Sequence, residues 1–207
     1  TTVEVHGSHI RFLNAADVSG SVVMHTDTAN DGTAHIGYRG TVPTSGYTVN
    51  GAAATAADNY YHLVRNTTEF QAMSTDVTKN YMLENDINFG GGGLTPIGDN
   101  ATPFTGKFDG NFFQLQNFTI TGGVYTAPFG KVSNSRIENV GVTGATVTGD
   151  KTGYQDRWAG GLIGYADGTK IKNVYIKNST VDGEAGQHGG IVGQTAGTTL
   201  DSIYSKA

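Results

Sequence analysis

The sequence predicts an all-β fold, a right-handed parallel β-helix (a solenoid) with one short helix and loop insertions. Glycine accounts for 31 of 207 residues and charged residues for only 15%, a composition that favours short strands and tight turns over helices. A phrase of the form apolar-x-Asn-apolar-x-apolar also recurs along the second half of the chain, as solenoid repeats do. Crossovers between parallel strands are right-handed as a rule, which predicts the hand.

The recurring phrase has the alternation of a strand. Its copies lie at 115–120, 137–142, 171–176 and 200–203. In the third copy, Val174 and Ile176 are expected to point inward, and Tyr175 and Lys177 outward.

Asparagine occupies the same place in three copies of the phrase. We expect Asn117, Asn139 and Asn173 to stack at one turn as an internal ladder of side chains. Ser202 takes this place in the last copy, and its shorter side chain is expected to weaken the ladder there. The alternative is that these asparagines mark ordinary turns.

The chain is expected to form a single β-helical segment, 1–207, excised from a longer protein. Residues 1–79 would form strand-turn coils at the amino terminus, and residues 80–207 the repeat coils. An inserted loop at 149–157 would interrupt the repeat coils, because solenoids tolerate insertions between coils.

One short helix is expected near 67–75. Thr67 or Thr68 can cap its start, and Phe70 and Met73 would share one face.

Charge and cysteine content exclude several classes of function. The net charge is −5 with no basic run, so neither nucleic acid nor an anionic membrane is expected as a partner. No apolar stretch is long enough to span a membrane. Cysteine is absent, which excludes disulfides and thiolate metal sites, and no cofactor is expected.

Two patterns resemble metal sites and have simpler explanations. His6 and His9 are three residues apart, and on a strand such residues face opposite sides, so they do not share a metal easily. Asp27, Asn30 and Asp31 are candidate calcium ligands, but an ordinary Asn-Asp-Gly turn accounts for them.

A carbohydrate-cleaving β-helix would need paired carboxylates, or a carboxylate with a base, along one face. The candidates are Asp109, Glu138, Asp156, Arg157 and Lys170, and none recurs in register, so no catalysis is expected. Asp109→Asn is expected to weaken folding rather than an activity.

Aromatic residues gather around the inserted loop. Tyr154, Trp158 and Tyr165 are candidate ligand contacts, because the C–H face of a sugar packs against an aromatic ring. The alternative is that Trp158 only covers the edge of a coil.

Four Asn-x-Ser/Thr sequons occur, and abundant asparagine and threonine can produce such sequons by chance. Asn66, Asn100 and Asn178 are the candidate glycosylation sites. The fourth, Asn117, is expected to be buried in the ladder and so unmodified.

The motifs resemble the GLUG-motif repeats of filamentous-haemagglutinin-like, high-molecular-weight adhesins of two-partner secretion. The residues that carry the resemblance are Trp158–Gly164 and Gly189–Gly193, with the segments Tyr81–Asn88, Thr95–Gly98 and Pro103–Asn111 before them. It covers 80–207 well and 1–79 loosely.

The resemblance implies a secreted or bacterial cell-surface β-helix that attaches to a host-cell receptor or glycan, exported by an outer-membrane transporter. Two departures limit it. The Asn-Pro-x-Gly type motif of the secretion domain is absent, and so is the His-Glu-x-x-His motif of the zinc protease domain that accompanies GLUG repeats in immunoglobulin A proteases. A carbohydrate-active enzyme and a stalk that binds nothing are the alternative functions.

Overall fold

The computed structural model describes residues 2–6, 9–12, 21–25, 35–38, 47–49, 52–53, 60–150, 157–183 and 186–206, with side chains from residue 61 onward. The chain divides into two compact units, Thr1–Leu63 with Asn80–Met82, and Val64–Lys79 with Leu83–Ala207. The expected single segment with a change near residue 79 differs from this division. Residues 64–79 belong with the second unit because they contribute Phe70 to its core.

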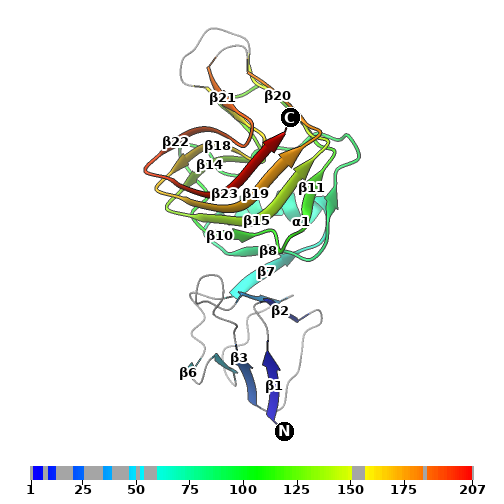
Figure 1. Ribbon diagram of the computed structural model, residues 1–207, viewed down its shortest axis with the longest axis vertical. Coiled ribbons are helices and arrows are strands. Elements are labelled where there is room, and N and C mark those ends of the chain that lie inside the picture. Colours follow the sequence, from blue (N-terminus) through cyan, green and yellow to red (C-terminus); the bar gives the residue numbers. More distant parts are fainter. Residues whose placement is uncertain are drawn as a thin grey trace. The chain divides into compact units, whose positions relative to one another are not determined.

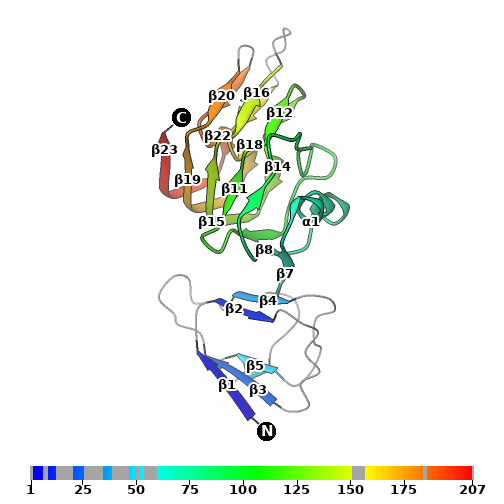
Figure 2. The same ribbon diagram turned by 90° about the vertical axis from the view of Figure 1, so that its right-hand side faces the viewer.

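The first unit consists of short parallel strands that alternate between two rows (Figure 2). One row contains β1 (Thr2–His6), β3 (Ser21–His25) and β5 (Tyr47–Val49), and β6 (Ala52–Ala53) joins β5 antiparallel. The other row contains β2 (His9–Phe12), β4 (His35–Tyr38) and β7 (Tyr60–Val64). Tyr61, Leu63 and Met82 form a buried cluster in this unit, Met82 from β8 (Tyr81–Leu83).

The second unit is a parallel β-helix (Figure 1). Its longest strands are β15 (Arg136–Thr143), β19 (Lys170–Lys177) and β23 (Thr199–Lys206), which pair in parallel. Ile137, Ile171 and Leu200 are register partners, so the last three copies of the phrase form successive coils as the sequence predicts. One coil earlier, β10 (Lys107–Asp109) pairs with the first half of β15 and β11 (Gln114–Gln116) with its second half. In turn, β9 (Ile87–Asn88) pairs with β11.

Three further parallel sheets complete the coils among the described residues. They consist of β12 (Thr119–Thr121), β16 (Thr146–Thr148) and β20 (Thr180–Asp182); β13 (Tyr125–Thr126), β17 (Trp158–Gly160) and β21 (Gln187–Gly189); and β14 (Phe129–Ser133), β18 (Ile163–Asp167) and β22 (Val192–Ala196). The predicted class, an all-β parallel β-helix with one short α-helix among the described residues, is confirmed.

Side chains alternate along the strands as predicted. On β19, Val174 and Ile176 are buried, Tyr175 is half-buried and Lys177 is exposed. The interior holds large apolar side chains, and burying each of these contributes about 1.5–3 kcal/mol.

The first copy of the phrase is placed differently from the expectation. Leu115 pairs with Val142, in the second half of β15, whereas the partner of Ile137 one coil earlier is Phe108. Residues 115–120 are therefore not the coil that precedes 137–142. The phrase occurs at two different places in the coil, because both places need an apolar strand and a turn residue.

The predicted helix lies where expected, as α1 (Thr67–Ala72) followed by the 3-10 turn η1 (Met73–Thr75). Phe70 and Met73 are both fully buried. The Phe70 ring meets those of Phe89, Phe108 and Phe129 at centroid distances of 5.7, 6.2 and 6.1 Å, so the helix closes this part of the core.

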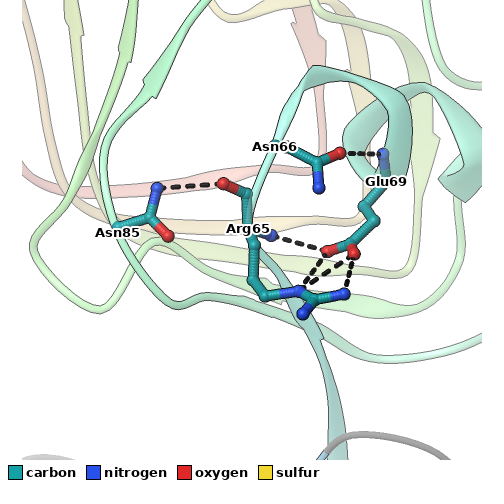
Figure 3. Close-up of polar contacts among 4 residues, drawn as sticks. All are labelled: Arg65, Asn66, Glu69 and Asn85. Atoms are coloured by element: carbon teal, nitrogen blue, oxygen red, sulfur yellow. Dashed lines mark hydrogen bonds and ion pairs between the residues drawn. The ribbon is translucent and has the colours of Figure 1, made fainter.

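The cap of α1 is one residue earlier than predicted (Figure 3). Asn66, not Thr67 or Thr68, is the N-cap, because its extended backbone lets its Oδ1 accept a hydrogen bond of 2.9 Å from Glu69 N. The Glu69 carboxylate turns back to the Arg65 guanidinium, with an Nε–Oε1 distance of 2.9 Å. Hydrogen bonding to Arg65 lowers the pKa of Glu69.

Candidate functional site: an aromatic column beside a groove

Three aromatic side chains, from β13, β17 and β18, form a column on the β-helix. Tyr125 and Trp158 are register partners on β13 and β17, and their rings stack at 5.1 Å with an interplanar angle of 18°. Tyr165 on β18 meets Trp158 at 5.2 Å and 53°. The stacking follows from the spacing of about 4.8 Å between paired strands, which sets register partners at a ring-stacking distance.

A groove of about 890 Å³ adjoins this column. Tyr125, Trp158 and Val124 form one wall, and the segment from Pro96 to Thr102 lines much of the remainder. Trp158 covers one face of the Tyr125 ring, and both residues line the groove.

The segment Asp99–Thr102 is here called the rim of the groove, and the Asp99 carboxylate holds its backbone in place. Asp99 Oδ1 accepts hydrogen bonds from Ala101 N and Thr102 N, both at 2.8 Å, and from Thr102 Oγ1 at 3.1 Å. These bonds, that of the Thr102 backbone first, lower the pKa of Asp99. The rim therefore presents an ionised carboxylate at neutral pH.

Lys131 links the rim to the column. Its Nζ donates to Asn100 Oδ1 at 2.8 Å and lies 5.5 Å from the centre of the Tyr165 ring. The same ammonium thus bonds the loop and makes a cation–π contact with the column.

Two of the three predicted ligand contacts, Trp158 and Tyr165, come together in this column, and Tyr154 lies outside the described residues. Tyr125 was not among the ligand contacts predicted from the sequence. The coil repeat could have identified it, because Tyr125 is the register partner of Trp158 in the preceding coil. An ion pair between Arg157 and Asp150 lies at the base of the inserted loop.

The asparagine ladder forms at one corner of the coils, here called the ladder corner: Asp109, Gly110, Asn139, Asn173 and Ser202. Asn173 Nδ2 donates to Asn139 Oδ1 at 3.0 Å, and Asn139 Nδ2 donates to Asp109 Oδ1 at 3.1 Å. Ser202 Oγ bonds its neighbour Asp201 instead, at 2.8 Å. The ladder thus begins at Asp109, a residue that the sequence analysis did not place in it.

Asn117 is not part of this ladder. It lies at a second corner, here called the open corner, with Gly144 and Asn178, because the preceding residues Gln116, Thr143 and Lys177 are register partners. All three have a left-handed backbone, with φ of 53°, 68° and 51°. Asn117 Nδ2 donates to Asn88 Oδ1 at 3.2 Å.

Three sequon asparagines, Asn66, Asn100 and Asn178, are exposed, and their glycosylation stays a prediction. Asn66 and Asn100 use Oδ1 as an acceptor, from Glu69 N and Lys131 Nζ. The expected burial of Asn117 was wrong, because the open corner is exposed, so burial does not set that sequon apart.

The catalytic candidates do not meet at the groove. Asp109 is fully buried and holds Asn111 N at 2.8 Å, and Glu138 is buried against Arg136 at 2.6 Å. Arg157 is engaged by Asp150, Lys170 is exposed on β19, and Asp156 lies outside the described residues.

The described residues contain neither a candidate metal site nor a membrane-spanning helix. Within them, no group of three or more potential ligand side chains could hold a metal ion. The side chains of His6 and His9, and the residues Asp27, Asn30 and Asp31, lie outside the description. No described helix is long and apolar enough to cross a membrane.

The fold and the groove define a β-helical solenoid with an aromatic surface site. No family model matches the chain. Its sequence is similar to halomucin from Haloquadratum walsbyi, with 33% identity over 179 residues that cover 77% of this chain and 2% of halomucin.

The structure is similar to that of a candidate immunoglobulin A1 protease from Bacteroides ovatus. The TM-score is 0.54 at 23% identity, over 72% of this chain and 58% of that one. This likeness concerns the fold alone. The chain spans a small part of halomucin and less than two thirds of the Bacteroides protein.

Proposed function

We propose that the chain is a β-helical segment of a secreted or cell-surface adhesin that binds saccharide at the aromatic column and its groove. The observation that carries this proposal is the groove of about 890 Å³ with the stacked rings of Tyr125 and Trp158 both in its wall. Ligand sites typically enclose about 300–1,000 Å³. A ring held rigidly by a second ring offers a flat apolar surface to the C–H face of a sugar, at little cost in conformational entropy.

The rim supplies the polar half of such a site. Asp99, Asn100 and Thr102, which carry a carboxylate, an amide and a hydroxyl, line the same groove as the column. Hydroxyl groups of a saccharide can donate to the carboxylate and to the amide oxygen and accept from the amide nitrogen. The site therefore pairs one apolar wall with one hydrogen-bonding wall.

Similarity to halomucin, whose name denotes a mucin, favours a secreted or surface-exposed protein. The resemblance to GLUG-repeat adhesins adds a bacterial cell surface, a host-cell receptor or glycan as partner, and an outer-membrane transporter for the full-length chain. We propose binding without catalysis, because Asp109 and Glu138 are buried in structural hydrogen bonds rather than exposed at the groove.

The test is binding of the purified chain to a broad glycan array and to epithelial cells, with thermal unfolding measured in parallel. Tyr125→Ala and Trp158→Ala are expected to abolish saturable binding while the protein stays folded. Leu200→Ala, which shortens an exposed apolar side chain on β23, is the matched control and should bind normally.

Three outcomes contradict the proposal. A folded chain that binds neither glycans nor cells is a stalk or scaffold. Undiminished binding by both variants moves the site elsewhere. Cleavage of an array glycan makes the chain a carbohydrate-active enzyme.

A further inference from the structure

A second aromatic site lies on the outer face of β15, β19 and β23, which run side by side in Figure 1. A shallow groove of about 350 Å³ is lined there by three aromatic side chains, Phe112, Tyr175 and Tyr204. Asn139, Asn173 and Ser202 of the ladder corner also line it and add polar groups. It shares no lining residue with the groove beside Tyr125.

Phe112 is held in a conformation that needs an explanation. Its φ is 65°, in the left-handed region, and its side chain is 63% exposed. A bulky residue rarely adopts this backbone conformation, and it costs roughly 1–2 kcal/mol. Phe112 receives little burial in return. Strain of this kind concentrates at ligand sites, where it presents a side chain to a partner.

The two tyrosines form a column in register. Tyr175 and Tyr204 are paired across β19 and β23, and the ring of Tyr175 lies over Gly141 of β15. Burial and, to a smaller extent, the Asp86 carboxylate raise the pKa of Tyr175. Its phenol therefore stays protonated at neutral pH and can donate a hydrogen bond.

Positive charge is concentrated beside these rings. Strands β19 and β23 carry four lysines, Lys170, Lys172, Lys177 and Lys206, and one acidic residue, Asp201, which makes them net positive in a chain of net charge −5. Lys177 and Lys206 are register partners, and like charges directly opposite are destabilising. A bound anion would relieve this repulsion. Lys177 Nζ also lies 5.4 Å from the centre of the Tyr175 ring, so the charge borders the aromatic surface.

We propose that this face, the lysine–tyrosine face formed by Phe112, Tyr175, Lys177, Tyr204 and Lys206, binds a saccharide that carries carboxylate groups. The rings pack against the sugar, and Lys177 and Lys206 pair with its carboxylates. A small groove with one pair of lysines fits a short acidic saccharide better than nucleic acid, which needs a continuous basic path along its backbone. The proposal does not rest on the function proposed for the groove beside Tyr125.

The experiment titrates the full chain with tetragalacturonate and with the uncharged cellotetraose, by calorimetry, at 20 mM and 300 mM salt. We expect tetragalacturonate to bind and to weaken at the higher salt. The double variant Lys177→Gln/Lys206→Gln should lose affinity at least about tenfold. The control Arg65→Gln/Lys79→Gln also removes two positive charges, one just before α1 and one in the loop after η1, and should bind normally.

Phe112→Gly separates binding from folding. Glycine tolerates the left-handed backbone, so the melting temperature should hold or rise while affinity for tetragalacturonate falls. Tyr125→Ala should leave this binding unchanged, which distinguishes failure here from failure of the other site.

The proposal is overturned if tetragalacturonate does not bind at millimolar concentration, or if the lysine double variant binds it as tightly as the unaltered chain. Equal affinity for cellotetraose and tetragalacturonate would also overturn it, because the lysines would then not recognise the carboxylates. Tighter binding of a short single-stranded DNA would make the face a nucleic-acid surface instead.

Discussion

The ladder corner and the open corner use the same residue type in the same backbone conformation, but only the ladder corner has a buried asparagine, Asn139. Asn139 and Asn117 both have φ of 53°. Asn139 is 7% exposed and is hydrogen-bonded on both sides, to Asn173 and to Asp109, whereas Asn117 is exposed. The comparison separates two reasons for asparagine at a corner: tolerance of a left-handed backbone, which both corners need, and a buried network, which only one has.

The largest effect is expected for Gly110→Ala at the ladder corner. A Cβ at Gly110 would lie 2.4 Å from both Asn139 O and Val140 Cβ and 2.6 Å from Val140 Cα, so backbone must move. We expect the free energy of unfolding to fall by about 3 kcal/mol or more, measured by chemical denaturation. Gly93→Ala, where an added Cβ meets nothing within 4 Å, is the matched control. Equal stability of the two variants would mean that the ladder corner is not tightly packed.

Asn139→Ala should be nearly as costly. It removes both ladder hydrogen bonds, leaves the buried Asp109 and the half-buried Asn173 with fewer partners, and puts alanine in a left-handed conformation. About 3 kcal/mol is expected by denaturant unfolding. Asn139→Gly removes only the strain of the left-handed backbone and still lacks the ladder hydrogen bonds. Its free energy of unfolding should therefore remain about 2 kcal/mol below that of the unaltered chain. Full recovery by glycine would show that the ladder bonds contribute nothing.

Asn117→Ala should lower the free energy of unfolding less than Asn139→Ala does, because the open corner has backbone strain but no buried hydrogen-bond network. A decrease of about 1 kcal/mol is expected from the left-handed conformation, measured by denaturant unfolding. Asn117→Gly should be close to neutral, in contrast to Asn139→Gly. If Asn117→Gly is as damaging as Asn139→Gly, the two corners are energetically equivalent and the difference in burial does not matter.

The error over Asn117 shows where the repeat could and could not be read from the sequence. Residues 137, 171 and 200 were aligned correctly because the phrase and the spacing to Gly130, Gly164 and Gly193 repeat together over a full coil. The copy at 115–120 has the phrase without that spacing. Both corners demand an apolar strand followed by a left-handed residue, so the phrase alone does not distinguish them.

Only the aromatic column of the candidate site could be predicted from the sequence. Trp158 and Tyr165 stand out as aromatic residues in a sequence of small ones, and Tyr125 follows from the coil register. The rim could not be predicted, because it depends on how Asp99 folds its own loop and on the reach of Lys131 to Asn100 across 31 positions of sequence. These are tertiary contacts without a local pattern.

The smallest effect is expected where a polar contact is exposed, at the start of α1. In the folded state, hydrogen bonding to Arg65 lowers the pKa of Glu69, so this carboxylate stabilises the fold above its ordinary pKa of about 4.3. The contribution is lost as pH falls through the lower pKa of the folded state. Solvent screens the contact, so Glu69→Gln should lower the melting temperature at pH 7 by no more than about 2 °C.

The difference between Glu69→Gln and the unaltered chain should vanish once the pH is well below the lowered pKa of Glu69 in the folded state, because the carboxylate is then protonated in both the folded and the unfolded state. The glutamine variant keeps Asn66 as the N-cap, so the helix start is otherwise the same. A loss as large as that of Asn139→Ala would contradict the comparison, because an exposed ion pair would then matter as much as the buried ladder. A small, pH-dependent loss would identify burial, rather than the number of polar contacts, as the source of stability at the corners of this β-helix.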